Sequence, residues 1–147
     1  AELTGEENVI ELYSGVGTLT AFLAEQAAEI VAVERNPDAV ADLSVNLNDL
    51  ENVNVFEGEV EAVLPLMPEG VELIVAHPDG SGLSRKAIKV VAQAKPHQFI
   101  YVSSDVATLA RDGRSLAKAG YRLVAVQPID MQPQTFHIET VSLWEQR

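Results

Sequence analysis

The sequence predicts an α/β fold with an open, mostly parallel sheet and an antiparallel pair of strands at its carboxyl end. Short apolar runs alternate along the chain with segments whose apolar residues recur at helical spacing. A Gly-x-Gly turn at Gly15 and Gly17 links the first apolar run to a helix pattern. The last two runs are joined by Pro128–Phe136, which is long enough for a hairpin but too short for a parallel crossover.

The first strand is expected to begin the stretch Asn8–Thr18, where it buries Val9, Ile10 and Leu12. Six more strands are expected at Glu29–Glu34, Val53–Glu57, Val71–Ala76, Gln98–Ser103, Tyr121–Gln127 and His137–Trp144. Helices are expected at Thr18–Ala27, from Asn36-Pro37 to about Leu47, near Glu61–Leu66, at Ser84–Ala94, and from Ser104 or Asp105 to Ala119.

Helix boundaries follow from local chemistry. Asn36 is expected as an N-cap with Pro37 in the first turn, because the Asn side chain accepts from free N–H groups and Pro has none to leave unpaired. Ser104 or Asp105 is expected to cap the last helix, and Gly120 to end it. The polar stretch His77–Gly82 follows the fourth strand and is expected as a turn or a functional rim.

Composition limits the possible classes of protein. A length of 147 residues with 47% hydrophobic and 22% charged residues fits one folded domain, residues 1–147. There is no apolar run of roughly 20 residues, as a membrane span needs, and no signal-peptide pattern, so a cytoplasmic protein without membrane contact is expected. Cys is absent, which excludes disulfides, thiolate metal sites and a thiol nucleophile, and no metal site is expected. The chain begins with Ala, which suggests a piece of a longer protein.

The net charge of −12 is divided unevenly. Residues 1–84 hold 17 acidic residues and one basic residue, whereas residues 85–147 hold nine basic and five acidic residues. Arg111, Arg114 and Lys118 are spaced three and four apart, so they are expected on one helical face. The carboxyl-terminal half is either an ordinary solvated surface or one wall of a polyanion site such as RNA.

The glycine turn suggests a nucleotide-like ligand. The dinucleotide pattern needs Gly or Ala three residues after the second glycine, but Thr20 stands there. Glu34 and Glu59 follow the second and third strands, so both reach the carboxyl edge of the sheet. With the terminal hairpin, this pattern favours a class I S-adenosylmethionine (SAM) methyltransferase, with Glu34 on the ribose and Glu59 on the adenine amino group. A plain structural turn and a nicotinamide dehydrogenase are the disfavoured alternatives.

Three motifs resemble one known family over nearly the whole chain. ELYSGVGT is similar to the family's Asp-Leu-Tyr-Cys-Gly-x-Gly-Asn/Thr, and YVSSDVATLARD to its Tyr-Val-Ser-Cys-Asn-Pro-Ala-Thr-Leu-Ala-Arg-Asp. The tail GYRLVAVQPIDMQPQTFHIE resembles its Gly-Tyr…Asp-Met-Phe-Pro-x-Thr-x-His-x-Glu. The family is that of the SAM-dependent RNA uracil-C5 methyltransferases, whose members also carry an RNA-binding barrel and an inserted domain.

The resemblance implies a role for particular residues. Tyr13 and Thr18 match cofactor contacts, and His77 matches an acidic residue that lines the SAM and substrate crevice. In the family a cysteine adds to carbon 6 of uracil, carbon 5 takes the methyl group, and a base removes the carbon-5 proton. Glu139 matches that base, and Ser104 stands at the position of the cysteine.

Three further departures accompany Ser104. Asp105-Val106 replaces the family's Asn-Pro, His77-Pro78-Asp79-Gly80 replaces its Asp-Pro-Pro-Arg, and Ser14 replaces a second Cys. No spacing argument places His97 or His137 beside Ser104 to activate it. Two functions remain: an RNA methyltransferase domain with altered or weakened chemistry, or a non-catalytic SAM- or RNA-binding module. Oligomeric state and the target RNA stay open.

Overall fold

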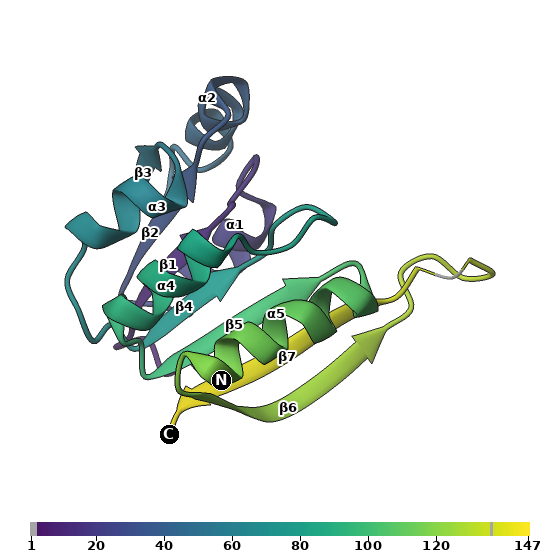
Figure 1. The fold of residues 1–147 in the computed structure, drawn as a ribbon. Helices are drawn as coiled ribbons and strands as arrows, with labels where there is room; N and C mark the ends of the chain where they lie inside the picture. The colour runs from purple at the N-terminus through teal and green to yellow at the C-terminus, as the bar shows by residue number, and fades with distance from the viewer. Residues whose placement is uncertain (1–2, 136) are drawn as a thin grey trace.

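Residues 3–135 and 137–147 are described in the computed structural model shown in Figure 1. The strands are β1 (Asn8–Leu12), β2 (Glu29–Glu34), β3 (Val53–Glu57), β4 (Leu73–Ala76), β5 (Gln98–Ser103), β6 (Tyr121–Ile129) and β7 (Glu139–Gln146). The helices are α1 (Thr18–Ala24), α2 (Pro37–Asn46), α3 (Val60–Val63), the 3₁₀ helix η1 (Leu64–Leu66), α4 (Arg85–Ala94) and α5 (Val106–Lys118).

The strands form one sheet in the order β3-β2-β1-β4-β5-β7-β6. Neighbouring strands from β3 to β5 are parallel, whereas β7 is antiparallel to both β5 and β6. The predicted fold class is therefore confirmed, including the terminal hairpin. Phe136, within the predicted hairpin connection, lies outside the described residues.

Alternating side chains divide the core between the two faces of the sheet. Ile10 and Leu12 pack with residues of α3, α4 and α5, whereas Val9 packs with α1. Leu43 and Leu47, in and just after α2, pack on Ala32 of β2. Figure 1 shows α4 and α5 on one face of the sheet, with α5 running along β5 and β7. The parallel strands β1 to β4 all end at one edge, and the residues that follow them meet there.

Local capping explains most helix boundaries. The Asn36 side chain accepts from the Asp38 N–H at 3.0 Å, with Pro37 in the first turn, as expected. Asp105 rather than Ser104 caps α5, because its carboxylate accepts from the Thr108 N–H at 2.6 Å. Gly120, with φ +98°, follows the helix at its carboxyl end.

Several predicted boundaries were wrong by two or three residues. Helix α1 ends at Ala24 instead of Ala27, and β4 begins at Leu73 instead of Val71. Strand β7 begins at Glu139 instead of His137, because the His137 N–H donates to the Thr135 hydroxyl at 3.2 Å and the chain is still turning there. That shift makes Glu139 the first residue of the strand.

Candidate functional site

A cleft of about 380 Å³ lies at the carboxyl edge of the parallel strands. It is lined by Tyr13, Glu34, Arg35, Asn36, Glu59, Glu61, His77, Pro78, Asp79, Ser81, Gly82 and Ser84. Four of the predicted site residues, Tyr13, Glu34, Glu59 and His77, therefore line one cavity although up to 64 positions separate them in the sequence. Each lies at the carboxyl end of a different parallel strand, or within two residues of it, which explains why they meet.

The glycine turn forms one side of this region. Gly15 has φ +56°, and a Cβ at this position would have no heavy atom within 4 Å, so open space faces its backbone. Gly17 has φ +87°, and a Cβ there would lie 2.9 Å from Leu47 Cδ1. The two glycines thus have different roles, since Gly17 permits helix packing and Gly15 leaves room for a ligand. Thr18 is the first residue of α1.

Two polar groups lie at or beside the glycine turn. The Ser14 hydroxyl oxygen is buried and has no hydrogen-bond partner among the described residues. Glu34 accepts the Gly15 N–H at 2.9 Å, the Arg35 N–H at 2.9 Å and the Asn36 N–H at 2.8 Å. A carboxylate offers about four acceptor sites, so Glu34 can fix the turn and still accept a ligand hydroxyl.

The cleft is strongly acidic. Glu34, Glu59, Glu61 and Asp79 line it, and Arg35, which lies 3.5 Å from Glu59, is the one basic residue that lines it within the described chain, apart from His77. Hydrogen bonds from the Ser81 hydroxyl and N–H hold the pKa of Asp79 below its usual value, so it carries a full charge at neutral pH.

Tyr13 stays neutral in this cleft. Burial raises the pKa of its phenol to about 12, and the nearby Glu61 and Glu59 carboxylates add to this effect. Its φ of +62° lies in the left-handed region, which is strained for a non-glycine residue. The strained backbone holds the phenol at the cleft as a neutral hydrogen-bonding group.

A buried acid lies in β1, just before the turn. Glu11 is only 1% exposed and accepts a hydrogen bond from the Thr20 hydroxyl at 2.6 Å. Burial raises the pKa of Glu11 to about 7, because it outweighs the opposite effect of the Thr20 hydrogen bond. The Thr20 that breaks the dinucleotide pattern therefore has a structural role, linking α1 to β1.

Glu11→Gln is expected to be more stable than the wild type above neutral pH. The folded protein retains the Glu11 proton up to about pH 7, whereas the unfolded chain releases it near 4.5, so wild-type stability falls across this interval. The gain from Gln should grow between these pH values to at most about 3 kcal/mol. Urea unfolding at pH 5 and pH 8 measures it, with the exposed Glu25→Gln as the charge-matched control. Equal changes in the free energy of unfolding for Glu11→Gln and Glu25→Gln would contradict the raised pKa of Glu11.

A second group of predicted residues lies where β4, β5 and β7 meet. The His77 Nε2 atom lies 3.9 Å from Glu139 Oε2. Ser103 pairs with Thr140 between β5 and β7, so Ser104 follows that ladder directly opposite Glu139. A Cβ built on Gly80 would lie 3.6 Å from the Ser104 hydroxyl oxygen, which places Ser104 beside the His77–Gly82 loop. The two predicted catalytic residues and His77 are therefore neighbours.

His97 is excluded as a partner of Ser104. It directly precedes β5, and its N–H donates to the Val71 carbonyl at 3.0 Å, so it lies at the amino edge of the sheet. Ser104 follows β5 at the opposite edge, about 20 Å away for six strand residues.

Sequence reasoning missed the residue that holds the loop beside the cleft. Asp112 of α5 is 2% exposed, and its carboxylate accepts the Leu83 N–H at 2.8 Å and the Tyr101 hydroxyl at 2.9 Å. Arg111 donates to Asp112 at 2.8 Å and to the Ser81 carbonyl at 2.7 Å. No local sequence signal indicates these contacts, because they join the loop at Leu83, β5 and α5.

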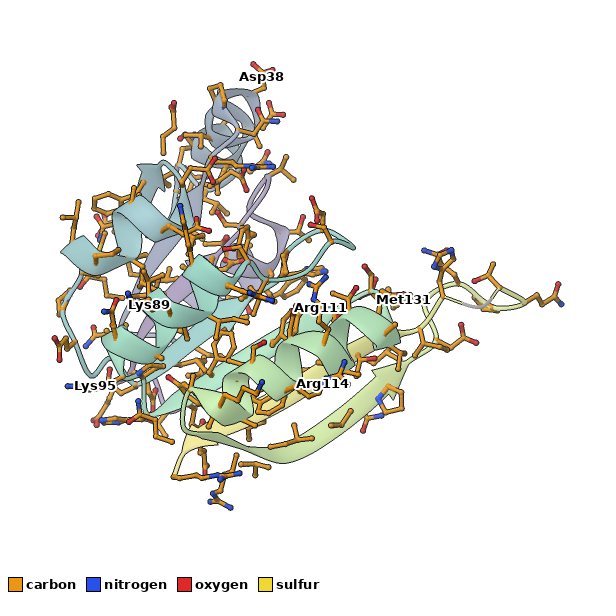
Figure 2. All side chains as sticks on the ribbon, in the orientation of Figure 1. Asp38, Lys89, Lys95, Arg111, Arg114 and Met131 are labelled. Atoms are coloured by element: carbon orange, nitrogen blue, oxygen red, sulfur yellow. The ribbon has the colours of Figure 1, made fainter. Side chains whose placement is uncertain are left out.

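These contacts show that the predicted basic residues of α5 have different surroundings. Arg111 binds the loop, whereas Arg114 lines a separate apolar groove between α5 and β6. Figure 2 shows Arg111 and Arg114 on α5, and Asp38 at the far end of the molecule on α2. Arg111 is already paired within the protein, with Asp112 and the Ser81 carbonyl.

The fold has many solved counterparts. Over 97% of this chain it matches the Pyrococcus abyssi tRNA (uracil-54, C5)-methyltransferase, solved with S-adenosyl-L-homocysteine, with a TM-score of 0.84 and 27% identity. It also matches Aeropyrum pernix fibrillarin, solved with SAM, with a TM-score of 0.79 and 14% identity, over 97% of this chain and 68% of that one. The chain has the class I SAM-methyltransferase fold. It spans 35% of the Pyrococcus chain.

Sequence relatives agree with this fold. A protein of Caldanaerobacter subterraneus named as an uncharacterised RNA methyltransferase is 41% identical over 150 residues, and one of Halalkalibacterium halodurans with the same description is 43% identical over 150 residues. Both alignments cover 99% of this chain and 33% of the relative, so the chain spans about a third of the length of these relatives. The family model for ribosomal RNA adenine dimethylases matches residues 1–63. Among the described residues, no helix is long and apolar enough to cross a membrane.

Proposed function

We propose that residues 1–147 form the SAM-binding catalytic domain of an RNA methyltransferase that acts on carbon 5 of uridine. The acidic cleft beside the glycine turn is the observation that carries the cofactor assignment. SAM has a net positive charge, from its sulfonium and ammonium groups and one carboxylate. A nicotinamide dinucleotide carries two phosphate charges, which four carboxylates would repel. The cleft therefore fits SAM and disfavours the dinucleotide.

The residues around the cleft supply suitable groups for SAM. The open space beside Gly15 admits the cofactor against the backbone, and Glu34 retains an acceptor site for a ribose hydroxyl. Glu59 is proposed to accept from the adenine amino group, with Tyr13 and Thr18 as further contacts. The bound cofactor supplies an electrophilic methyl group.

The uridine target rests on different observations. The Pyrococcus neighbour is a uracil-C5 enzyme at 27% identity, and its similarity spans the region of Ser104 and Glu139. The match to adenine dimethylases covers only residues 1–63, which contain the glycine turn but neither of these two residues. It supports a methyltransferase and leaves the target base open. The basic carboxyl-terminal half is proposed to contact the RNA.

The proposed reaction assigns separate tasks to Ser104 and Glu139. The Ser104 hydroxyl releases its proton to water as its oxygen adds to carbon 6 of uracil. The electron pair of the 5,6 double bond then makes carbon 5 nucleophilic enough to take the methyl group, and S-adenosylhomocysteine is the leaving group. Glu139 accepts the carbon-5 proton, and the Ser104 oxygen leaves carbon 6 and regains a proton from water as the 5,6 double bond re-forms. A serine hydroxyl is almost wholly protonated at neutral pH, so we expect the first step to be slow. If it never occurs, the domain is a SAM- and RNA-binding module.

Calorimetry with SAM tests the cofactor assignment. We expect wild-type protein to bind SAM and Gly15→Ala to bind it at least tenfold more weakly, because the new methyl group fills the space next to the turn. The same substitution should lower the free energy of unfolding by only about 1 kcal/mol, since no protein atom lies within contact of that Cβ.

Gly17→Ala is the matched control for this experiment. Its Cβ would press on Leu47 and Leu43, so it should destabilise folding by more than Gly15→Ala does. Absence of any heat with SAM for the folded wild-type protein would refute the cofactor assignment. Tighter binding of NADH than of SAM would do the same and would favour the dehydrogenase alternative.

A further inference from the structure

Glu139 has an unusual environment for the first residue of a strand. Its side chain is 25% exposed, but the Oε2 atom is buried and has no hydrogen-bond partner among the described residues. Buried carboxylate oxygens are normally paired, and an unpaired one requires a functional or structural reason. A proton accepted on this atom also needs a path to solvent before Glu139 can act again.

His77 lies on that path. It follows β4 and has its Nε2 atom 3.9 Å from Glu139 Oε2, within ion-pair distance but longer than a hydrogen bond. Hydrogen bonds at active sites are often long before substrate binds, so this spacing suits a contact that forms during the reaction. The His77 side chain is 46% exposed and lines the acidic cleft, so the ring lies near Glu139 and is also open to solvent.

We propose that His77 relays the proton that Glu139 removes from carbon 5. This inference rests on the proposed function. The C5–H bond breaks as its electron pair forms the 5,6 double bond and the nucleophile leaves carbon 6. The proton passes to Glu139 Oε2, then to His77 Nε2, and the imidazolium releases a proton to water, which restores both residues. Histidine suits this role because it changes charge near neutral pH.

Other charged groups also face His77 across the cleft. Asp79 belongs to the same loop, and Glu34, Glu59, Glu61 and Arg35 line the same cavity from other elements. Together these groups form the general electrostatic field of the cleft. Glu139 differs because it is the acid within ion-pair distance of the ring in the described chain. A test must therefore separate the Glu139 contact from the general field of the cleft.

Proton NMR of the folded protein makes this separation. The chain has three histidines, and His77→Asn identifies the His77 ring signals. We expect Glu139→Gln to change the chemical shifts of the His77 ring protons, because its carboxylate lies 3.9 Å from the ring. Glu61→Gln, which removes one charge from the same cleft, should change them by less than half as much. Equal shifts, or no shift with Glu139→Gln, would overturn the proposed contact.

The relay itself is tested by tritium release from carbon 5 of labelled uridine in RNA, in a Ser104→Cys background. We expect His77→Ala to slow release at least tenfold and free imidazole to restore part of it, which a purely structural role would not allow. Unchanged release, or slow release that imidazole does not improve, would refute the relay. Failure of the wild-type protein to bind SAM would instead refute the proposed function, and the NMR result would still decide the contact.

Discussion

Ser104→Cys is expected to raise the formation of 5-methyluridine by at least about a hundredfold at pH 7.5. A free cysteine is a few per cent thiolate near neutral pH and is intrinsically nucleophilic, whereas a serine hydroxyl without a base is almost fully protonated. Ser104 follows the β5–β7 ladder opposite Glu139, so the new thiol would lie next to the proposed base. Incubation with methyl-labelled SAM and uridine-containing RNA, followed by nucleoside analysis, measures the change.

Ser103→Cys is the matched control for this gain. Ser103 is buried, and its hydroxyl donates to the Asp105 carbonyl at 2.9 Å, so a thiol there points into the protein one residue away from the site. It should leave 5-methyluridine formation at the wild-type level. A similar gain from both variants would show that any added thiol suffices and would remove Ser104 from the reaction.

Glu139→Gln in the Ser104→Cys background gives a second diagnostic result. Without a base to remove the carbon-5 proton, the cysteine cannot leave carbon 6, so a covalent protein–RNA adduct should accumulate and survive denaturation in detergent. Adduct formation without free product would assign the nucleophile to position 104 and the base to Glu139. Free 5-methyluridine at an undiminished rate would show that another residue removes the proton.

The carboxyl edge of the sheet was predictable because parallel strands fix which residues meet. Glu34, Glu59 and His77 each directly follow a strand or nearly so, and the order of strands needs no side-chain detail. The hairpin was equally accessible, since a nine-residue connection cannot cross the sheet. Those two deductions were enough to predict both the fold and the position of the cleft.

Contacts between side chains of distant elements were not predictable in the same way. The helical spacing of Arg111 predicts the face of the helix on which its side chain lies, but it does not show which groups of other elements that side chain contacts. The start of β7 depends on the turn at Thr135, and the contact of Glu139 with His77 joins the ends of two strands far apart in the sequence. The Asp112 contacts join three elements, so no local pattern reports them.

Asp112→Ala is expected to destabilise the fold by about 2–6 kcal/mol, because each buried hydrogen-bonding group left unsatisfied costs about 1–3 kcal/mol. It leaves the buried Leu83 N–H and the Tyr101 hydroxyl without an acceptor, and it removes one acceptor of the Arg111 guanidinium. Burial already raises the pKa of the Tyr101 phenol, so this group stays neutral and cannot compensate as a charge. Urea unfolding, with the slope compared between variants, measures the loss.

Tyr101→Phe separates the central role of Asp112 from the value of one hydrogen bond. It removes one donor but leaves Asp112 paired with Leu83 and Arg111, so we expect a loss of about 1–2 kcal/mol. The two variants should also differ in SAM affinity, because only the loss of Asp112 releases the Ser81–Leu83 segment that borders the cleft. Equal destabilisation by both variants, with unchanged SAM affinity, would mean that α5 does not hold the loop His77–Gly82. The backbone contacts within this loop would then be sufficient to fix its position beside the cleft.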